Sequence, residues 1–433
     1  METNIYSLSP LDGRYKEKTF DLSLYFSEAA LINYRTKIEI EYFNFLLKFL
    51  EIDYSDFKNF ELKESDLKKV KEIETITKHD VKAVEMFLRE ILKEKKYSEY
   101  IHFGLTSQDI NSSSYVLSMK ETNQEIIVPE INKLLLELHK KSFDWKNIPM
   151  LAKTHGQPAT PTNLGKEMMV FIERIEIQTE KLKNFNYTTK FGGAVGNFHA
   201  HYTSYPKYNW FEFGNNFIES LGLKRNQFTT QIDHYDNYSE LFDILKRIST
   251  ILTDFCRDIW LYISNNYFKQ KCVPDEVGSS TMPHKINPIN FENAEGNLMI
   301  AVSFFEFMSR KLPISRLQRD LTDSTVLRNI GSCYGYLLVG LRSILSGLKR
   351  LEVNHLIIEK DLEDNKIVLS EAIQTILRRE GVSNSYDIIK NATRNKSFDL
   401  DEIIISLKEK DLLTVQLETE IYGLDIINNT WNF

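Results

Sequence analysis

The chain of 433 residues is long enough for about three domains of roughly 150 residues each. Its hydrophobic content of 42% can supply a large core. Its net charge of −7 argues against non-specific binding to nucleic acid or anionic membrane, which needs a basic surface. Cys256, Cys272 and Cys333 lie far apart without a C-x-x-C pair, which is typical of reduced thiols rather than a disulfide framework or zinc site. The N-terminus lacks a signal-peptide pattern and no apolar stretch is long enough for a bilayer, so we expect a cytoplasmic protein.

The first 22 residues carry Ser-Pro and Asp-Gly turn signals, followed by Arg14 and Tyr15. Arg14 is a fork-shaped donor that suits a phosphate or carboxylate, although an ordinary surface arginine would look the same. In residues 26–50 and 63–95, apolar residues recur three and four apart, which predicts helices.

Two short polar motifs follow. Lys78, His79 and Asp80 lie within the second helical pattern, where a histidine is more often packed or exposed than functional. Thr106 and Ser107 precede a long helical pattern and predict a helix N-terminus, whose free N–H groups suit a carboxylate. A structural cap alone would also explain the pair. We place the first domain boundary near residue 110.

The next segments alternate between helices and compact polar loops. Residues 112–145 read as helix with a kink at Pro129, and residues 164–182 as another helix. Between them, residues 153–162 form a polar loop with His155, the residue type most often used to move a proton near neutral pH. A loop histidine that caps a helix is the competing interpretation.

Two further segments resemble binding motifs only superficially. The glycine-rich residues 192–197 lack the preceding strand and the G-x-G-x-x-G spacing of a dinucleotide loop, which excludes NAD binding. His199 and His201 have no third ligand at useful spacing, so we expect no metal site.

Residues 235–271 repeat apolar side chains at three and four without glycine or proline, which predicts a helix of roughly 50 Å. A helix of this length belongs in a bundle. Residues 327–348 repeat the pattern with four glycines, which we interpret as sites of close helix approach. No strand-like alternation of any length occurs, so we predict an all-α chain whose long helices pack against a second copy. A short helical domain follows residue 355.

Two polar segments flank these helices. Residues 278–288, GSSTMPHKINP, place hydroxyls, Lys285 and Asn287 in a proline-stiffened loop whose N–H groups suit an oxyanion that forms during a reaction. Residues 315–329 contain three arginines, which are suited to phosphate but in most proteins are merely solvated. A plain polar connection is the alternative for both segments.

Residues 278–288 resemble the signature loop of the fumarase/aspartase superfamily, whose members eliminate fumarate. Together with residues 9–15, 77–85 and 153–162, the loop is similar to the adenylosuccinate lyase family in the form common in bacteria. The similarity covers most of the chain and is weakest in the C-terminal part. The loop alone is specific to the superfamily and not to one substrate.

From the length and the helical patterns we expect an all-α fold of three domains: residues 1–110, a central long-helix bundle of residues 111–355, and residues 356–433. The resemblance implies a homotetramer with shared active sites and a cofactor-free lyase. The expected substrates are adenylosuccinate and the succinyl-carboxamide ribotide that occurs earlier in purine biosynthesis, with no metal, nucleic-acid or membrane partner.

The resemblance also assigns roles. His155 and Ser279 are the expected catalytic acid and base. The expected substrate-binding residues are Arg14, Tyr15, Lys78, His79, Asp80, His102, Thr106, Ser107, Gln231, Lys285, Asn287, Arg319, Ser324 and Arg328.

Argininosuccinate lyase, aspartase and fumarase are the alternatives within the superfamily, and they have no nucleotide phosphate to bind. The cluster of Arg319, Ser324 and Arg328 therefore argues against them. A non-catalytic helical protein descended from such a lyase is the alternative of another class, and retention of His155, Ser279 and Lys285 argues against it.

Overall fold

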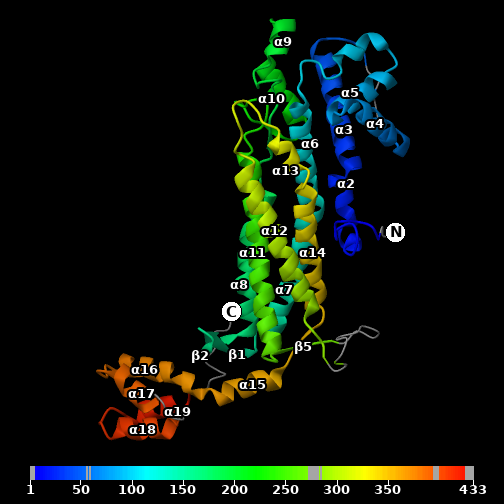
Figure 1. Cartoon of the computed structure of the whole chain (residues 1–433). Helices are drawn as coiled ribbons and strands as arrows, with labels where there is room; N and C mark the ends of the chain where they lie inside the picture. The colour runs from blue at the N-terminus through cyan, green and yellow to red at the C-terminus, as the bar shows by residue number, and fades with distance from the viewer. Residues whose placement is uncertain are drawn as a thin grey trace. The chain divides into compact units, whose positions relative to one another are not determined.

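The computed structural model describes residues 5–54, 57, 60–271, 282, 285–393 and 399–424. Helices dominate these residues, as predicted, and the few strands are short. The chain forms two compact units (Figure 1). Unit 1 contains Met1–Lys133, Glu176–Asp254 and Glu292–Ile344; unit 2 contains Leu134–Ile175, Phe255–Phe291 and Leu345–Phe433. The division into three domains along the chain stays a prediction.

Unit 1 begins with short helices and a helical hairpin, and continues into long helices that lie side by side in Figure 1. The elements up to the bundle are α1(Lys16–Thr19), η1(Phe20–Leu22), α2(Ser23–Phe26), α3(Glu28–Phe49), α4(Glu64–Thr77), α5(Asp80–Ile91) and η2(Lys95–Tyr100). The long helices that run wholly or largely through the unit are α6(Ser107–Thr122), α11(Asp236–Ser264), α12(Ile289–Lys311) and α14(Ile330–Leu348). Shorter elements are β3(Thr188–Thr189), α9(His199–Ser204), α10(Trp210–Ser220), β4(Lys224–Arg225) and α13(Thr322–Leu327), and β3 pairs with β4 in parallel.

The longest predicted helix forms but ends earlier than its apolar pattern suggested. α11 stops at Ser264, which gives 29 residues and about 43 Å at ~1.5 Å per residue. Asn266 adopts a left-handed backbone with φ 59°, and the N–H of Tyr267 donates to the carbonyl of Tyr262 over 2.8 Å. This is a common helix-ending arrangement, in which an asparagine accepts the positive φ at little cost. The predicted end at residue 271 was therefore wrong.

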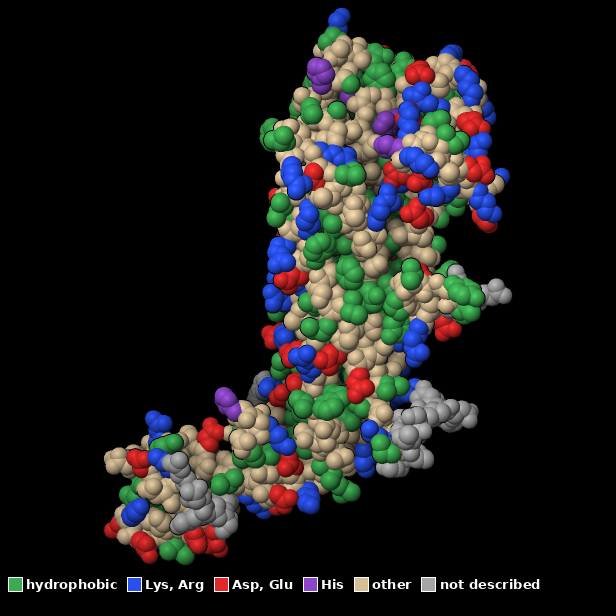
Figure 2. Space-filling model, in the orientation of Figure 1, with side chains coloured by type: hydrophobic (Ala, Val, Ile, Leu, Met, Phe, Trp, Pro, Cys, Tyr) green, Lys and Arg blue, Asp and Glu red, His purple; other side chains and the backbone are tan. Residues whose placement is uncertain are grey.

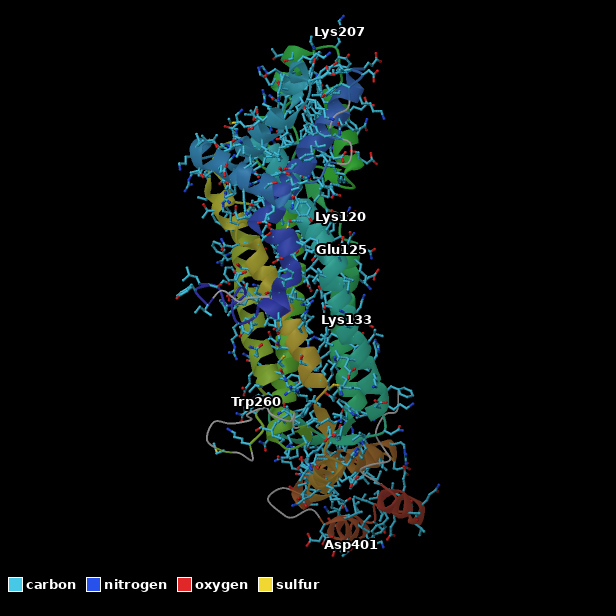
Figure 3. All side chains as sticks on the ribbon, turned by 90° about the vertical axis from the view of Figure 1, so that its right-hand side faces the viewer. Lys120, Glu125, Lys133, Lys207, Trp260 and Asp401 are labelled. Carbon is cyan, nitrogen blue, oxygen red and sulfur yellow. The ribbon has the colours of Figure 1, made fainter. Side chains whose placement is uncertain are left out.

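A single π-helical turn lies just before Pro129, where the sequence predicted a kink. η3(Asn123–Ile127) joins α6 to α7(Val128–Trp145) just before the proline, which lacks the N–H that a regular α-helix uses. Figure 3 shows Lys120, Glu125 and Lys133 one below another along this nearly continuous helix. The hydroxyl of Tyr25 donates to Glu125 Oε2 over 2.7 Å.

Close helix approach at the glycines of α14 is confirmed. A Cβ added to Gly331 would lie 2.6 Å from Phe26 Cβ, and one added to Gly340 would lie 2.6 Å from Leu298 Cγ. Both distances are well below ordinary van der Waals contact, so the absence of a side chain is what allows the neighbouring helices to pack.

Unit 2 contains a second segment for which the sequence prediction was wrong. The predicted loop at residues 153–162 belongs to a hairpin in which β1(Pro149–Thr154) pairs antiparallel with β2(Gln157–Asn163). His155 and Gly156 form its two-residue turn, with φ of 54° and 72°, the positive values that a type I′ turn requires. Proline residues and the lack of clean alternation hid the strands.

The remaining elements of unit 2 are helical apart from one small strand pair. They are α8(Leu164–Lys183), β5(Phe268–Gln270), which pairs antiparallel with β6(Leu351–Val353), α15(His355–Asp364), η4(Lys366–Val368), α16(Leu369–Arg379), α17(Ser385–Thr393), α18(Leu400–Lys408) and α19(Val415–Tyr422). The C-terminal helices share an apolar cluster that includes Ile373, Leu377, Ile404 and Ile421. Among the described residues, no helix is long and apolar enough to cross a membrane.

Candidate active site

The first turn of α6 is fixed by a buried carboxylate. The helix N-terminus predicted at Thr106 and Ser107 is present, and the Thr106 N–H donates to Asp109 Oδ2 over 2.8 Å, so Asp109 caps its own helix. Asp109 is fully buried and also accepts the Lys190 ammonium at 2.7 Å and the N–H of Gly192 at 2.8 Å. Burial raises the pKa of Asp109, but Lys190 and the N–H donors outweigh it and hold this pKa below its usual range. Ser107, the first residue of the helix, is thereby held in place.

His79 begins the neighbouring helix α5 and points its other ring nitrogen at α6. Its Nδ1 accepts the N–H of Lys82 over 3.2 Å, so this nitrogen carries no proton. In the neutral ring the proton therefore sits on Nε2, which lies 3.3 Å from Ser107 Oγ. The helix cap thus sets the tautomer of His79 and makes it a hydrogen-bond donor at the N-terminus of α6.

Asp80 lies between two arginines from distant parts of the chain. Arg35 Nη2 donates to Asp80 Oδ2 over 2.7 Å, and Arg328 Nη2 donates to the same oxygen over 3.0 Å. Arg35 is almost fully buried and also donates from Nε to Asn111 Oδ1 over 2.8 Å. Burial raises the pKa of Asp80, but the charges of Arg35 and Arg328 and the N–H of Val81 lower it by more. The net pKa is below its usual range, so the carboxylate is ionised.

Arg319 is held by partners from two other segments. Its Nη1 donates to Gln231 Oε1 over 3.3 Å and its Nη2 to Ser324 Oγ over 3.2 Å. Gln108 Nε2 lies 3.4 Å from the same serine oxygen. This arrangement fixes the guanidinium plane before any ligand binds, which is the state that suits bidentate recognition of an anion.

Several of these side chains line one cavity of about 300 Å³ in unit 1. It collects a large share of the predicted substrate-binding residues, namely Lys78, His79, Asp80, Ser107, Arg319, Ser324 and Arg328. Arg35 and Tyr115 also line it. With three arginines and a lysine against one carboxylate, the cavity carries excess positive charge and is suited to an anion. Figure 2 shows charged side chains crowded over α4 and α5, with histidine side chains at the border of this region.

Other predicted residues of unit 1 lie outside the cavity lining. His102 contacts Glu39 instead, with 2.6 Å between its Nδ1 and Glu39 Oε1. Arg14 is exposed, and Tyr15 accepts a hydrogen bond of 2.9 Å from Asn293 Nδ2. The neighbourhood of Tyr15 meets α14 at Ser343, which lies about 20 Å along that helix from its start beside Arg328.

The remaining predicted residues belong to unit 2. His155 occupies the exposed turn of the β1–β2 hairpin. Lys285 is exposed, and its N–H donates to the carbonyl of Met282 over 3.1 Å, while Asn287 is half-buried. Ser279 lies outside the described residues. Within the described residues, no cluster of three metal-ligating side chains occurs.

Comparisons with known proteins identify the family. A model described as lyase matches residues 57–302, and one described as adenylosuccinate lyase C-terminal matches residues 315–426. Adenylosuccinate lyase of Dictyostelium discoideum is 53% identical over 90% of this chain and 88% of its own. The chain belongs to the adenylosuccinate lyase family. The family members of Vibrio cholerae and Escherichia coli K12 are 42% and 43% identical, covering 97% and 92% of this chain and 97% and 91% of their own.

Solved structures agree with the family assignment at the level of fold. A fumarate lyase from Mesorhizobium sp. BNC1 superposes with a TM-score of 0.76 at 17% identity, over 96% of this chain and 95% of that one. A 3-carboxy-cis,cis-muconate lactonizing enzyme from Pseudomonas putida gives 0.72 at 18% identity, over 94% and 93%. At these identities the similarity shows the shared fold alone.

The sequence did not predict several residues that line the cavity, above all Arg35 and Asn111. One feature of the sequence could have identified Arg35. Arg35 and Glu39 lie in the same helical stripe as Ile32 and Phe43, at spacings of three and four, and both are buried. A charged residue in an apolar stripe needs a buried partner. The partner itself lies in another helix and leaves no trace in the local pattern.

Proposed function

We propose that the protein is an adenylosuccinate lyase that splits adenylosuccinate into AMP and fumarate. The same reaction on succinyl-aminoimidazole-carboxamide ribotide would give the carboxamide ribotide, so that the enzyme acts twice in purine biosynthesis, in the cytoplasm. The observation that carries the proposal is the cationic cavity of Arg319, Arg328 and Ser324 in a member of this family. Two preset guanidinium groups and a hydroxyl suit an anionic oxygen cluster such as a phosphate.

The chemistry is removal of a proton next to a carboxylate, followed by cleavage of a C–N bond. Because that proton is weakly acidic, the dianionic intermediate needs hydrogen-bond donors and positive charge around it. We assign Ser279 as the base and His155 as the acid that protonates the departing nitrogen. Lys285 and Asn287 would hold a substrate carboxylate, and Ser107, with the donor His79 beside it, would bind the other.

The first test is the ultraviolet change when purified protein is mixed with adenylosuccinate, with argininosuccinate, aspartate and malate as parallel substrates. We expect turnover of adenylosuccinate alone. Turnover of another substrate in its place would refute the nucleotide assignment and keep the superfamily. No turnover of any of the four compounds would refute the enzymatic proposal in favour of a non-catalytic helical assembly.

The acid and base assignments need substitutions. We expect Ser279→Ala and His155→Gln each to lose most turnover while the circular dichroism spectrum is unchanged. His199→Gln is a matched control, because His199 is an exposed histidine at the start of α9. Near-normal activity of either first variant would contradict its role.

We further propose that the active form is a homotetramer whose sites combine residues of several copies. Two observations support this. Arg14 and Tyr15 lie about 20 Å along α14 from the cavity of their own chain, too far to share one ligand. The long helix α12 also exposes an apolar face, with Met299 44% and Phe307 47% exposed.

Mixing two inactive variants tests the shared site. If Arg14 of one copy and Arg319 of another serve one site, Arg14→Ala and Arg319→Ala subunits mixed at random would restore about one quarter of the sites. Light scattering after gel filtration would report the tetramer. A mixture that stays inactive after subunit exchange, or a monomeric active protein, would contradict the proposal.

A further inference from the structure

Tyr15 stands at the end of a chain of hydrogen bonds that runs through three elements of unit 1. Lys18 Nζ donates to Ser343 Oγ over 2.8 Å, and Ser343 Oγ donates to Asn293 Oδ1 over 2.8 Å. Asn293 Nδ2 then donates to Tyr15 Oη over 2.9 Å. The four side chains come from α1, α14, α12 and the residue before α1.

The direction of these hydrogen bonds is fixed because the first side chain, Lys18, can only donate. A lysine ammonium carries three donors and no acceptor, so Ser343 Oγ must accept from Lys18. The single hydroxyl hydrogen of Ser343 then goes to Asn293, which sets the carbonyl oxygen of the amide toward Ser343 and the NH₂ toward Tyr15. Tyr15 therefore accepts, and its own O–H remains to donate.

The surroundings keep this order in place. Ser343 is fully buried in α14, so water does not compete for its hydroxyl group. Arg342, the neighbour of Ser343, donates from Nη1 to the carbonyl of Lys18 over 2.9 Å and thereby fixes the backbone of α1. Among the residues that the structure describes, the hydroxyl hydrogen of Tyr15 has no acceptor. A rigid donor without an acceptor is preorganised for a ligand oxygen.

We propose that Lys18 and Ser343 are positioning residues that act through Asn293 to present the Tyr15 hydroxyl as a hydrogen-bond donor to an anionic oxygen of the nucleotide. The inference rests on the proposed function and on the expectation that Tyr15 is a substrate-binding residue. It goes beyond that proposal because neither Lys18 nor Ser343 would touch the ligand. They orient the side-chain amide of Asn293, and this orientation leaves the hydroxyl hydrogen of Tyr15 available to a ligand.

The test measures the Kd of AMP by calorimetry, together with KM and kcat for adenylosuccinate. We expect Tyr15→Phe to weaken AMP binding about tenfold, as for a lost hydrogen bond to a charged group. Asn293→Asp is nearly isosteric, but both its oxygens accept, so Tyr15 would donate to it and lose its free hydrogen. We expect the same tenfold loss, carried by KM with kcat little changed.

A double-mutant cycle separates positioning from a direct or merely structural role. Ser343→Ala should weaken binding several-fold in the native background and leave Kd unchanged in the Tyr15→Phe background, since its effect passes through Tyr15. Lys18→Met should behave likewise. Ser346→Ala, an exposed serine of the same helix, serves as control and should leave Kd unchanged in both backgrounds. Equal losses from Ser343→Ala in both backgrounds would overturn the inference.

The outcomes also separate this inference from the proposed function. Absence of adenylosuccinate turnover in the native protein would refute the proposed function, while AMP affinity would still report on the chain of hydrogen bonds. An unchanged AMP affinity in Tyr15→Phe would overturn the inference, because there would be no donor to position. Normal affinity in Asn293→Asp beside a weakened Tyr15→Phe would overturn it alone.

Discussion

The buried pair of Asp109 and Lys190 should dominate the stability of unit 1. Both side chains are fully buried, with 2.7 Å between Lys190 Nζ and Asp109 Oδ1. Removing one partner of such a pair leaves an uncompensated charge in the core and costs about 3–5 kcal/mol of unfolding free energy. We expect both Lys190→Met and Asp109→Asn to fall in that range, but for different reasons and in a definite order.

The order follows from the partners that each variant leaves behind. In Lys190→Met, the Asp109 carboxylate keeps the N–H donors of Thr106, Gly192 and Gly193, so we expect the lower end, about 3 kcal/mol. In Asp109→Asn, the Gly193 carbonyl is the one hydrogen-bond acceptor that Lys190 keeps among the described residues, and the new NH₂ group faces N–H groups that need an acceptor. Unsatisfied buried donors add to the loss, so we expect about 5 kcal/mol.

Urea unfolding at fixed protein concentration measures the difference, since the apparent stability of the proposed homotetramer would depend on concentration. Lys37→Met is the control, because Lys37 is half-exposed and its pair with Glu121 spans 3.5 Å at the surface. The control should leave the midpoint nearly unchanged. A Lys190→Met protein as stable as the control, or one less stable than Asp109→Asn, would refute the reasoning.

Three further variants test other parts of the structure. Burial lowers the pKa of His102, but the charge of Glu39 outweighs burial and raises this pKa. The pair therefore stabilises the folded protein at low pH, and this stabilisation is lost as the pH rises through the raised pKa of His102. Glu39→Gln should therefore reduce the melting temperature more at about pH 6 than at about pH 9, and an equal loss at both would contradict this. Arg328→Lys keeps the positive charge but loses the planar guanidinium that can bind a phosphate in bidentate fashion, so calorimetry should show AMP binding weakened about tenfold. Unchanged affinity would argue against a phosphate contact. Gly340→Ala should destabilise by about 1–3 kcal/mol because its Cβ would meet Leu298, and adding Leu298→Ala should recover part of the melting temperature; no recovery would place the clash elsewhere.

Apolar periodicity predicted most of the fold because the signal is local and repeated. The stripe of α11 runs over 29 residues, so noise at single positions does not hide it. The β1–β2 hairpin was not predicted because its strands contain prolines and alternate poorly between apolar and polar residues. Its turn has a histidine, His155, where asparagine or aspartate would have been the familiar indication.

The candidate site shows the same division between local and non-local information. Lys78, His79 and Asp80 are adjacent in the chain, and a single motif suffices to name them. Arg35 reaches Asp80 across 45 positions, and only the folded chain brings them within 2.7 Å. A helical stripe can show that Arg35 is buried, but it cannot name the partner that such burial requires.

The glycine-rich residues 192–197 resemble an anion-binding loop, and the anion that they bind is part of the protein itself. Their N–H groups do surround a negative charge, as in a phosphate loop, but the charge is the carboxylate of Asp109 in the same chain. The spacing alone now argues against a dinucleotide there, because the short strand β3 does precede the segment. The segment acts on the site indirectly, because Asp109 also holds the Thr106 N–H and with it the start of α6, where Ser107 and His79 meet. These glycines thus help to position the start of α6 beside the cavity by donating to Asp109.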